Sequence, residues 1–274
     1  MGSCPVIIVT GAAGGIGYET VRILLQDLNA KVVATDLNVD RLKDLKNEFS
    51  QSLEIQAADI VESSTATMLV TTALKSFGKL DGICLIAGVF GPCLRMENAN
   101  VSEWEKAFRI NVFSHLHIYR AAIPEVRKTK GRIVLATSGA GHGALFSGWG
   151  FYSMSKTAVA FSVSQLKLEE PSIITVGVSP GLCDTKMVRD LMKGQHVGQT
   201  AEDVAHYNSF VAKIPMITPR VAGNAFARTV VSADSSLSGE VVDYDDHRLP
   251  LDEAAKRDTS ENRIGNMDYT KLTT

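Results

Sequence analysis

Several features that would set this chain apart from ordinary globular proteins are missing from its sequence. No apolar run approaches the roughly 20 residues that span a bilayer, and no basic region precedes the apolar run that begins at Pro5. Basic and acidic residues are nearly balanced, 28 against 30, so no basic surface for a nucleic acid is expected. These absences predict a cytoplasmic protein that binds neither nucleic acid nor membrane.

Cysteine is also scarce, and histidine is scattered. The four cysteines are Cys4, Cys84, Cys93 and Cys183, and no two of them form a C-x-x-C pair. They are expected to be small reduced side chains in a core or a loop. The six histidines show no metal-ligand spacing, so no metal is predicted.

What the sequence has instead is a regular alternation of short β-branched runs with longer amphipathic stretches. With 45% hydrophobic residues, the chain can bury a large core. Apolar residues fill consecutive positions in the runs, which is typical of parallel strands covered on both faces. Seven strands are predicted, at 5–10, 31–36, 53–59, 81–87, 131–137, 173–179 and 239–244. The pattern predicts a single-domain α/β Rossmann fold, a doubly wound parallel sheet with helices on both faces.

Start signals mark several of the helices between these strands. Ser102 and Glu105 have the spacing of a capping box, as do Thr200 and Asp203. Thr218-Pro219 places a cap before a first-turn proline.

Two segments interrupt the alternation. Residues 182–215 are too long for an ordinary connection and are expected to fold over a ligand as a lid. Because the alternation continues on both sides of this segment, residues 1–250 are assigned to one dinucleotide-binding and catalytic domain. Residues 251–274 are polar, without a clear apolar stripe, and are expected to form a loose or partner-contacting tail.

A glycine-rich turn between the first strand and the first helix predicts a dinucleotide site. The turn reads T-G-A-A-G-G-I-G and includes Gly11, Gly15, Ile16 and Gly17. Such glycines let backbone N–H groups approach a pyrophosphate at a helix N-terminus. Asp36 ends the second strand, 19 positions after Gly17, where an acid bonds the ribose of NAD and repels the 2′-phosphate of NADP. A turn without a ligand and a helix-capping aspartate are the alternatives.

The pair Tyr152 and Lys156 predicts acid–base chemistry. Residues four apart share one face of a helix, and an adjacent ammonium can lower the pKa of a phenol from about 10. A phenol tuned in this way suits proton transfer to a carbonyl. Ser138 follows the fifth strand, at the carboxyl edge where open α/β sheets bind ligands. Taken singly, the pair reads as an ordinary surface pair and the serine as a turn residue.

Together these motifs and Asn111 resemble the short-chain dehydrogenase/reductase family in its compact form, over about residues 5–249. The segments 148–152, 169–172 and 244–246 are similar to fungal benzil-reductase-like and sepiapterin-reductase-like members. The resemblance implies that Tyr152 is the general acid or base and that Ser138 orients the substrate oxygen. It further implies that Lys156 lowers the pKa of Tyr152 and holds the nicotinamide ribose, and that Asn111 holds a water that links Lys156 to solvent.

The resemblance also implies a cofactor site that extends beyond the glycine-rich turn. Adenine would lie against Asp59 and Ile60, and the nicotinamide carboxamide against Pro180, Gly181, Leu182 and Thr185. Ala87 and Gly88, together with Tyr152 and Lys156, complete the predicted cofactor-binding set.

Three features depart from the family pattern. Ile86 stands where the family usually has the asparagine of N-A-G, which puts local stability or cofactor fit in doubt. Ser138 precedes Tyr152 by 14 positions and not by the common 13, so the rim of the site is expected to differ. The narrower relatives mostly resemble NADP-dependent enzymes, whereas Asp36 favours NAD.

The predicted function is hydride transfer between NAD(H) and a ketone, diketone or secondary alcohol. The candidate pocket residues are Phe90, His142, Phe146, Trp149, Met187 and Leu191, although packing alone would also explain each of them. Two alternatives stay open, an NADP-dependent pterin or diketone reductase and a catalytically silent nucleotide sensor. The helix from Tyr152 has apolar residues on more than one side, which predicts a homodimer or homotetramer.

Overall fold

The computed structural model describes residues 4–143 and 146–256, which contain one seven-stranded, fully parallel sheet. The strand order is β3-β2-β1-β4-β5-β6-β7. The strands are β1 (Val6–Thr10), β2 (Lys31–Asp36), β3 (Leu53–Ala57), β4 (Gly82–Leu85), β5 (Arg132–Ala136), β6 (Ile174–Ser179) and β7 (Val241–Asp243). Each lies within a predicted run, so the predicted fold class is confirmed.

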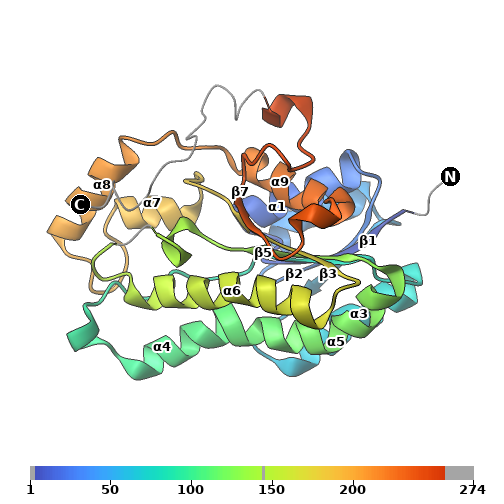
Figure 1. Ribbon diagram of the computed structural model, residues 1–274, viewed down its shortest axis with the longest axis horizontal. Helices are drawn as coiled ribbons and strands as arrows, with labels where there is room; N and C mark the ends of the chain where they lie inside the picture. The colour runs from blue at the N-terminus through green and yellow to red at the C-terminus, as the bar shows by residue number, and fades with distance from the viewer. Residues whose placement is uncertain (1–3, 144–145, 257–274) are drawn as a thin grey trace.

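Helices cover both faces of the sheet (Figure 1). One face carries α1 (Gly15–Gln26), α2 (Lys43–Glu48) and α9 (Pro219–Ser232). The other carries α3 (Ser63–Phe77), α5 (Ser114–Thr129) and α6 (Gly150–Glu169), and α4 (Val101–Phe108) leads into α5 through a π-helical turn. A separate apolar cluster fills each interface. This two-sided burial explains why the strands read as continuous apolar runs.

The predicted helix starts are confirmed in two cases and wrong in one. Thr200 and Asp203 form a reciprocal capping box at α8 (Ala201–Val211), and Thr218 is the N-cap before Pro219. The N-cap of α4 is Asn100 and not Ser102. Its side chain accepts a hydrogen bond from the Ser102 backbone nitrogen at 3.1 Å, which begins the helix two residues earlier.

The two segments that interrupt the alternation are partly ordered by packing. Residues 182–215 contain α7 (Lys186–Met192) and α8, which lie together beyond one end of the sheet (Figure 1). Leu251 and Ala255 are buried against the α1–α9 side of the core. Asp252 accepts a hydrogen bond from Asn224 of α9 at 2.6 Å. The rest of the predicted tail, 257–274, lies outside the described residues.

The sheet topology fixes where a ligand can bind. The chain proceeds outward from β1 to β3, then returns to place β4 on the other side of β1. At such a switch point the connections leave in opposite directions, which opens a crevice at the carboxyl ends of the strands. No helix of the described residues is both long and apolar enough for a membrane crossing.

Candidate active site

A cavity of about 510 Å³ lies at the carboxyl edge of the sheet. Segments that follow six strands, β1 to β6, line it. All the predicted cofactor residues are in its wall: Gly11, Gly15, Ile16, Gly17, Asp36, Asp59, Ile60, Ala87, Gly88, Tyr152, Lys156, Pro180, Gly181, Leu182 and Thr185. The structure therefore brings the predicted set together around one space.

At the β1 end, the glycine-rich turn is held by close backbone contacts. Gly11 has φ +65°, and a Cβ on it would lie 2.8 Å from Ala87. A Cβ on Gly17 would lie 2.1 Å from the Gly11 oxygen. The N-cap of α1, Gly14, supplies no side-chain hydrogen bond, so the first N–H groups of the helix are left for a ligand. A dinucleotide phosphate fits these donors and the helix dipole.

Asp36 lies beside this turn, and both of its carboxylate oxygens accept backbone hydrogen bonds. The donors are Ala13 N at 2.9 Å and Leu37 N at 2.8 Å. Each oxygen has further lone pairs for ribose hydroxyls. Arg41 also contacts the turn: its guanidinium donates to the Ala13 oxygen at 3.3 Å and lies 4.0 Å from the centre of the Tyr18 ring. The sequence showed no basic residue within the turn, but the fold brings one to it.

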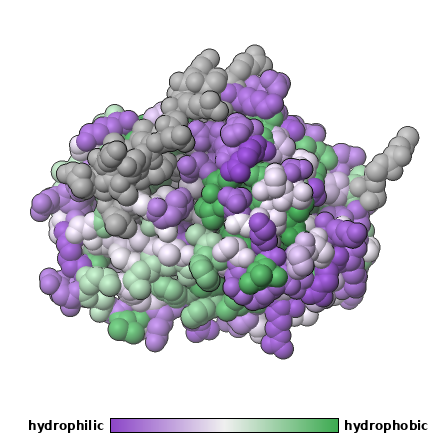
Figure 2. Space-filling model, viewed as in Figure 1, coloured by the Kyte–Doolittle hydropathy of each residue, from purple (hydrophilic) through white to green (hydrophobic). Residues whose placement is uncertain are grey.

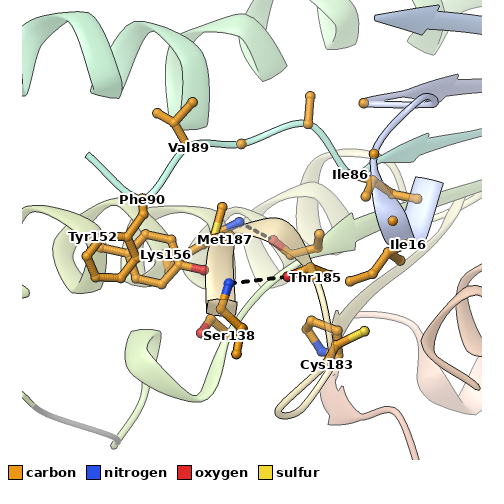
Figure 3. A pocket seen from close by; sticks show the side chains of 18 of the residues that line it. Ile16, Ile86, Val89, Phe90, Ser138, Tyr152, Lys156, Cys183, Thr185 and Met187 are labelled. Atoms are coloured by element: carbon orange, nitrogen blue, oxygen red, sulfur yellow. Dashed lines mark hydrogen bonds between the residues drawn. The ribbon is translucent and has the colours of Figure 1, made fainter. Parts of the chain in front are cut away.

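In the middle of the cavity, Ser138, Tyr152 and Lys156 converge (Figure 3). Tyr152 and Lys156 are one turn apart on α6, and the Lys156 Nζ lies 5.8 Å from the centre of the Tyr152 ring. Lys156 donates to the Ala136 oxygen at 2.8 Å, and the Ser138 and Tyr152 side chains line the cavity beside it. The Phe90 ring stacks on Tyr152 at 4.7 Å and fixes its orientation.

Burial controls the protonation of both groups on α6. It lowers the pKa of the Lys156 ammonium to about 8. It raises the pKa of the Tyr152 phenol, and the hydrogen bond with Ser138 opposes that rise. The sequence predicted a lowered Tyr152 pKa, and the structure gives the opposite direction because desolvation of the phenol outweighs the hydrogen bond with Ser138. Tyr152 is thus a protonated donor at neutral pH.

Asn111 lies behind this group, in the π-helical turn Arg109–Phe113, and is almost fully buried. Its Oδ1 accepts from Val89 N at 2.8 Å, and its Nδ2 donates to Val89 O at 2.9 Å and to Ser155 Oγ at 3.1 Å. A Cβ on Gly88 would lie 3.3 Å from Asn111 Oδ1 and 3.6 Å from Lys156 Nζ. The amide therefore ties the segment after β4 to α6. Its water-holding role stays a prediction.

The comparisons with known proteins agree with this geometry. A family model described as short chain dehydrogenase matches residues 5–196. The chain belongs to the short-chain dehydrogenase family.

Named relatives extend the match over most of the chain. An uncharacterised oxidoreductase of Schizosaccharomyces pombe is 33% identical over 241 residues, 87% of this chain and 96% of the relative. A benzil reductase, (S)-benzoin forming, of Saccharomyces cerevisiae is 28% identical over 257 residues, 89% and 97% of the two chains. The crystal structure of a Saccharomyces cerevisiae short-chain dehydrogenase/reductase superposes with a TM-score of 0.83 at 29% identity, over 90% of this chain and 98% of that one.

Although Ile86 replaces the usual family asparagine, the ends of β1 and β4 are still joined by side-chain hydrogen bonds. Thr10 Oγ1 accepts hydrogen bonds from Ile86 N at 3.2 Å and from Ala87 N at 3.3 Å. The Ile86 side chain packs against the core on the α1–α9 side and lines the cavity. A threonine hydroxyl thus ties β1 to the segment after β4.

At the far end, the cavity wall is aromatic and apolar. Five of the six predicted pocket residues line it: Phe90, Phe146, Trp149, Met187 and Leu191. His142 does not line the cavity and is exposed, since it lies beyond the end of the short 3₁₀ turn that follows Ser138. That pocket assignment was wrong.

Sequence reasoning missed the contribution of α8 to this end. Tyr207 and Phe210 from α8, and Ile214 just after it, line the same wall. No motif marks them, since an amphipathic helix buries such residues whatever it packs on. The only available signal was their position within the predicted lid. Among the described residues, no three His, Cys, Asp or Glu side chains converge as metal ligands would.

Proposed function

We propose that this protein interconverts a carbonyl group and a secondary alcohol, using NAD(H), on substrates that carry an apolar or aromatic group. The observation that carries the proposal is the convergence of Ser138, Tyr152 and Lys156 in a cavity that continues to the phosphate turn. The family membership supports oxidoreductase chemistry on CH–OH or C=O groups.

In the direction of reduction, Tyr152 donates the proton that the carbonyl oxygen gains. Ser138 holds that oxygen beside the phenol, and the Lys156 ammonium stabilises the phenolate that is left behind. Nicotinamide, when bound, supplies the hydride to the carbonyl carbon. Oxidation of the alcohol reverses the proton transfer.

The remaining contacts position the two partners. Pro180, Gly181, Leu182 and Thr185 are proposed to hold the carboxamide, and Asp59 and Ile60 the adenine. A Cβ on Gly181 would lie 2.5 Å from the Tyr244 ring, so the segment that begins at Pro180 packs closely against Tyr244, just after β7. Asn111 is proposed to hold a water behind Lys156 while its amide ties Val89.

NAD is the proposed cofactor because of Asp36. Its carboxylate lies at the turn where a 2′-phosphate would sit, and two like charges there repel. Arg41 is the observation that favours the second candidate, an NADP-dependent reductase, because its guanidinium lies against the same turn. Asp36 is the nearer to the cavity, since it lines the wall and Arg41 does not.

The aromatic wall supports an aromatic or bulky apolar ketone or diketone. Phe146 packs edge-on against Tyr207 at 5.7 Å and against Phe210 at 5.0 Å. The yeast relative named as a benzil reductase acts on a diaryl diketone, which is compatible with such a wall. The 182–215 segment is proposed to act as a lid. It already touches the opposite rim, where Cys93 N donates to Val197 O at 2.8 Å.

A homodimer or homotetramer in the cytoplasm is also proposed. Phe161 and Leu168 of α6 are 69% and 76% exposed, and Leu116 of α5 is 57% exposed. Figure 2 shows hydrophobic side chains along α6 on the viewed face. Val163 and Leu166 of the same helix are in the core, so α6 has two apolar sides.

The experiment that tests the proposal is replacement of Tyr152 by Phe. We expect kcat for an aryl ketone with NADH to fall by about 10³-fold, since the proton donor is lost. Binding of NADH, measured by fluorescence titration, is expected to stay within a factor of about two because the ring and its Phe90 contact remain. Tyr119→Phe, on α5 and outside the cavity wall, is the control. Turnover retained in Tyr152→Phe would refute the assigned role.

A further inference from the structure

A second phenol, Tyr207, faces the same cavity as Tyr152. The residue is 4% exposed, lines the cavity, and lies on α8. Its ring contacts Trp149 at 5.4 Å and Phe146 at 5.7 Å. Among residues 4–143 and 146–256, the Tyr207 hydroxyl makes no hydrogen bond to the protein and is not fully enclosed by it. Because Tyr207 lines the cavity, this hydroxyl is available to a ligand there.

The Tyr152 and Tyr207 phenols are close enough to interact electrostatically. Trp149 contacts both rings, Tyr152 at 6.1 Å and Tyr207 at 5.4 Å. Burial raises the pKa of Tyr207, and a negative charge on Tyr152 raises it further. Tyr207 therefore stays protonated at neutral pH and can donate its O–H to a neutral oxygen.

The rest of this end of the cavity offers little else that is polar. Its described wall is made of apolar and aromatic side chains: Phe90, Phe146, Trp149, Leu191, Phe210 and Ile214. The nearest charged lining residue of the lid, Lys186, has an 84% exposed side chain that is paired with Asp190. A ligand here is thus neutral and apolar, with two places for oxygen. One is at Ser138 and Tyr152, and the other is at Tyr207.

We infer that Tyr207 is a specificity-determining residue that donates a hydrogen bond to a second substrate oxygen next to the reacting carbonyl, so that the preferred substrates are aryl 1,2-diketones. The inference rests on the proposed function. One carbonyl carbon gains the hydride of NADH, its oxygen gains the Tyr152 proton, and NAD⁺ is released. The second carbonyl is unchanged and bonds Tyr207 throughout, which leaves an α-hydroxyketone as product.

The test compares Tyr207→Phe with wild type on a matched set of substrates. 1-Phenyl-1,2-propanedione has both carbonyls, whereas propiophenone and phenylacetone each have one of them. Loss of one hydrogen bond is expected to lower kcat/KM for the dione about tenfold, mainly through KM. Both monoketones are expected to change by less than about twofold, since they have no second oxygen to bond. Tyr119→Phe is the matched control and is expected to leave all three substrates unaffected.

The outcomes separate this inference from the proposed function. An equal loss on the dione and the monoketones, or no loss on the dione, overturns the role of Tyr207 while reduction itself stands. If wild type oxidises NADH with none of the three, the proposed function fails. Binding of the dione is then measured by quenching of tryptophan fluorescence. A selective weakening of about tenfold in Tyr207→Phe still supports the contact, and equal affinities overturn it.

Discussion

The two ends of the cavity are built in different ways. At the β1 end the wall is made of backbone. Glycine is required there because side chains do not fit: a Cβ on Gly17, for example, would lie 2.1 Å from the Gly11 oxygen. At the lid end the wall is made of side chains: Trp149 reaches it from the N-cap position before α6, and Tyr207 and Phe210 reach it from α8. The proposed ligand of the first end is a dinucleotide of constant structure, which suits a wall whose geometry is fixed by the backbone. At the lid end, substitution of a single side chain can change which substrate fits.

The difference predicts that cofactor choice and substrate choice respond to separate substitutions. Asp36 is proposed to accept hydrogen bonds from the ribose hydroxyls. Their loss in Asp36→Ser, worth about 2 kcal/mol, is expected to raise KM for NADH by roughly 30-fold. KM for NADPH is expected to fall because the repulsion is removed and Arg41 lies against the same turn. Steady-state kinetics with both cofactors measures the change.

The control for this substitution is the double variant Asp36→Ser with Arg41→Ala. It is expected to lose the gain on NADPH while the weak use of NADH stays. The ranking of ketone substrates should be the same in all three proteins. A changed ranking would contradict the separation of the two ends.

A smaller effect, on the pH dependence of kcat, is expected from Lys156, which lies between the two ends of the cavity. Its pKa of about 8 places loss of the ammonium within an accessible pH range. The charged form exists below the pKa, so kcat for reduction is expected to fall as pH rises through about 8, by roughly tenfold per unit above it. Tyr152 does not cause this fall, since burial raises its pKa and keeps it protonated.

Rate measurements between pH 6 and 10 check the profile, with NADH binding followed in parallel. In Lys156→Arg the residual activity is expected to lose the inflection, because a guanidinium stays charged. A wild-type rate that is flat up to pH 10 would show that the ammonium is not required.

Most of the fold was predictable because burial on both faces leaves a direct pattern in the strands. Val32, Val33 and Ala34 are all buried, and no alternating strand would read that way. The cofactor residues were predictable for a related reason. Gly11 and Gly17 are required by the backbone, so they appear at fixed spacing after the first strand.

What escaped prediction depends on contacts between distant segments. Arg41 reaches the phosphate turn only because the chain after β2 folds back on α1. Tyr207 and Tyr152, 55 positions apart in the sequence, contact the same Trp149 ring only because α8 packs against the residue that precedes α6. The direction of the Tyr152 pKa was wrong for a similar reason, because its burial comes from the whole wall and not from the neighbour one helical turn away.

The most direct test of the account follows one atom. NADH that carries deuterium at the transferred position of C4 is incubated with the enzyme and 1-phenyl-1,2-propanedione, and the hydroxyketone product is analysed by mass spectrometry. The account predicts one deuterium on the new carbinol carbon, and no labelled product with Tyr152→Phe over the same time. An unlabelled hydroxyketone, or equal labelling with the variant, would contradict it.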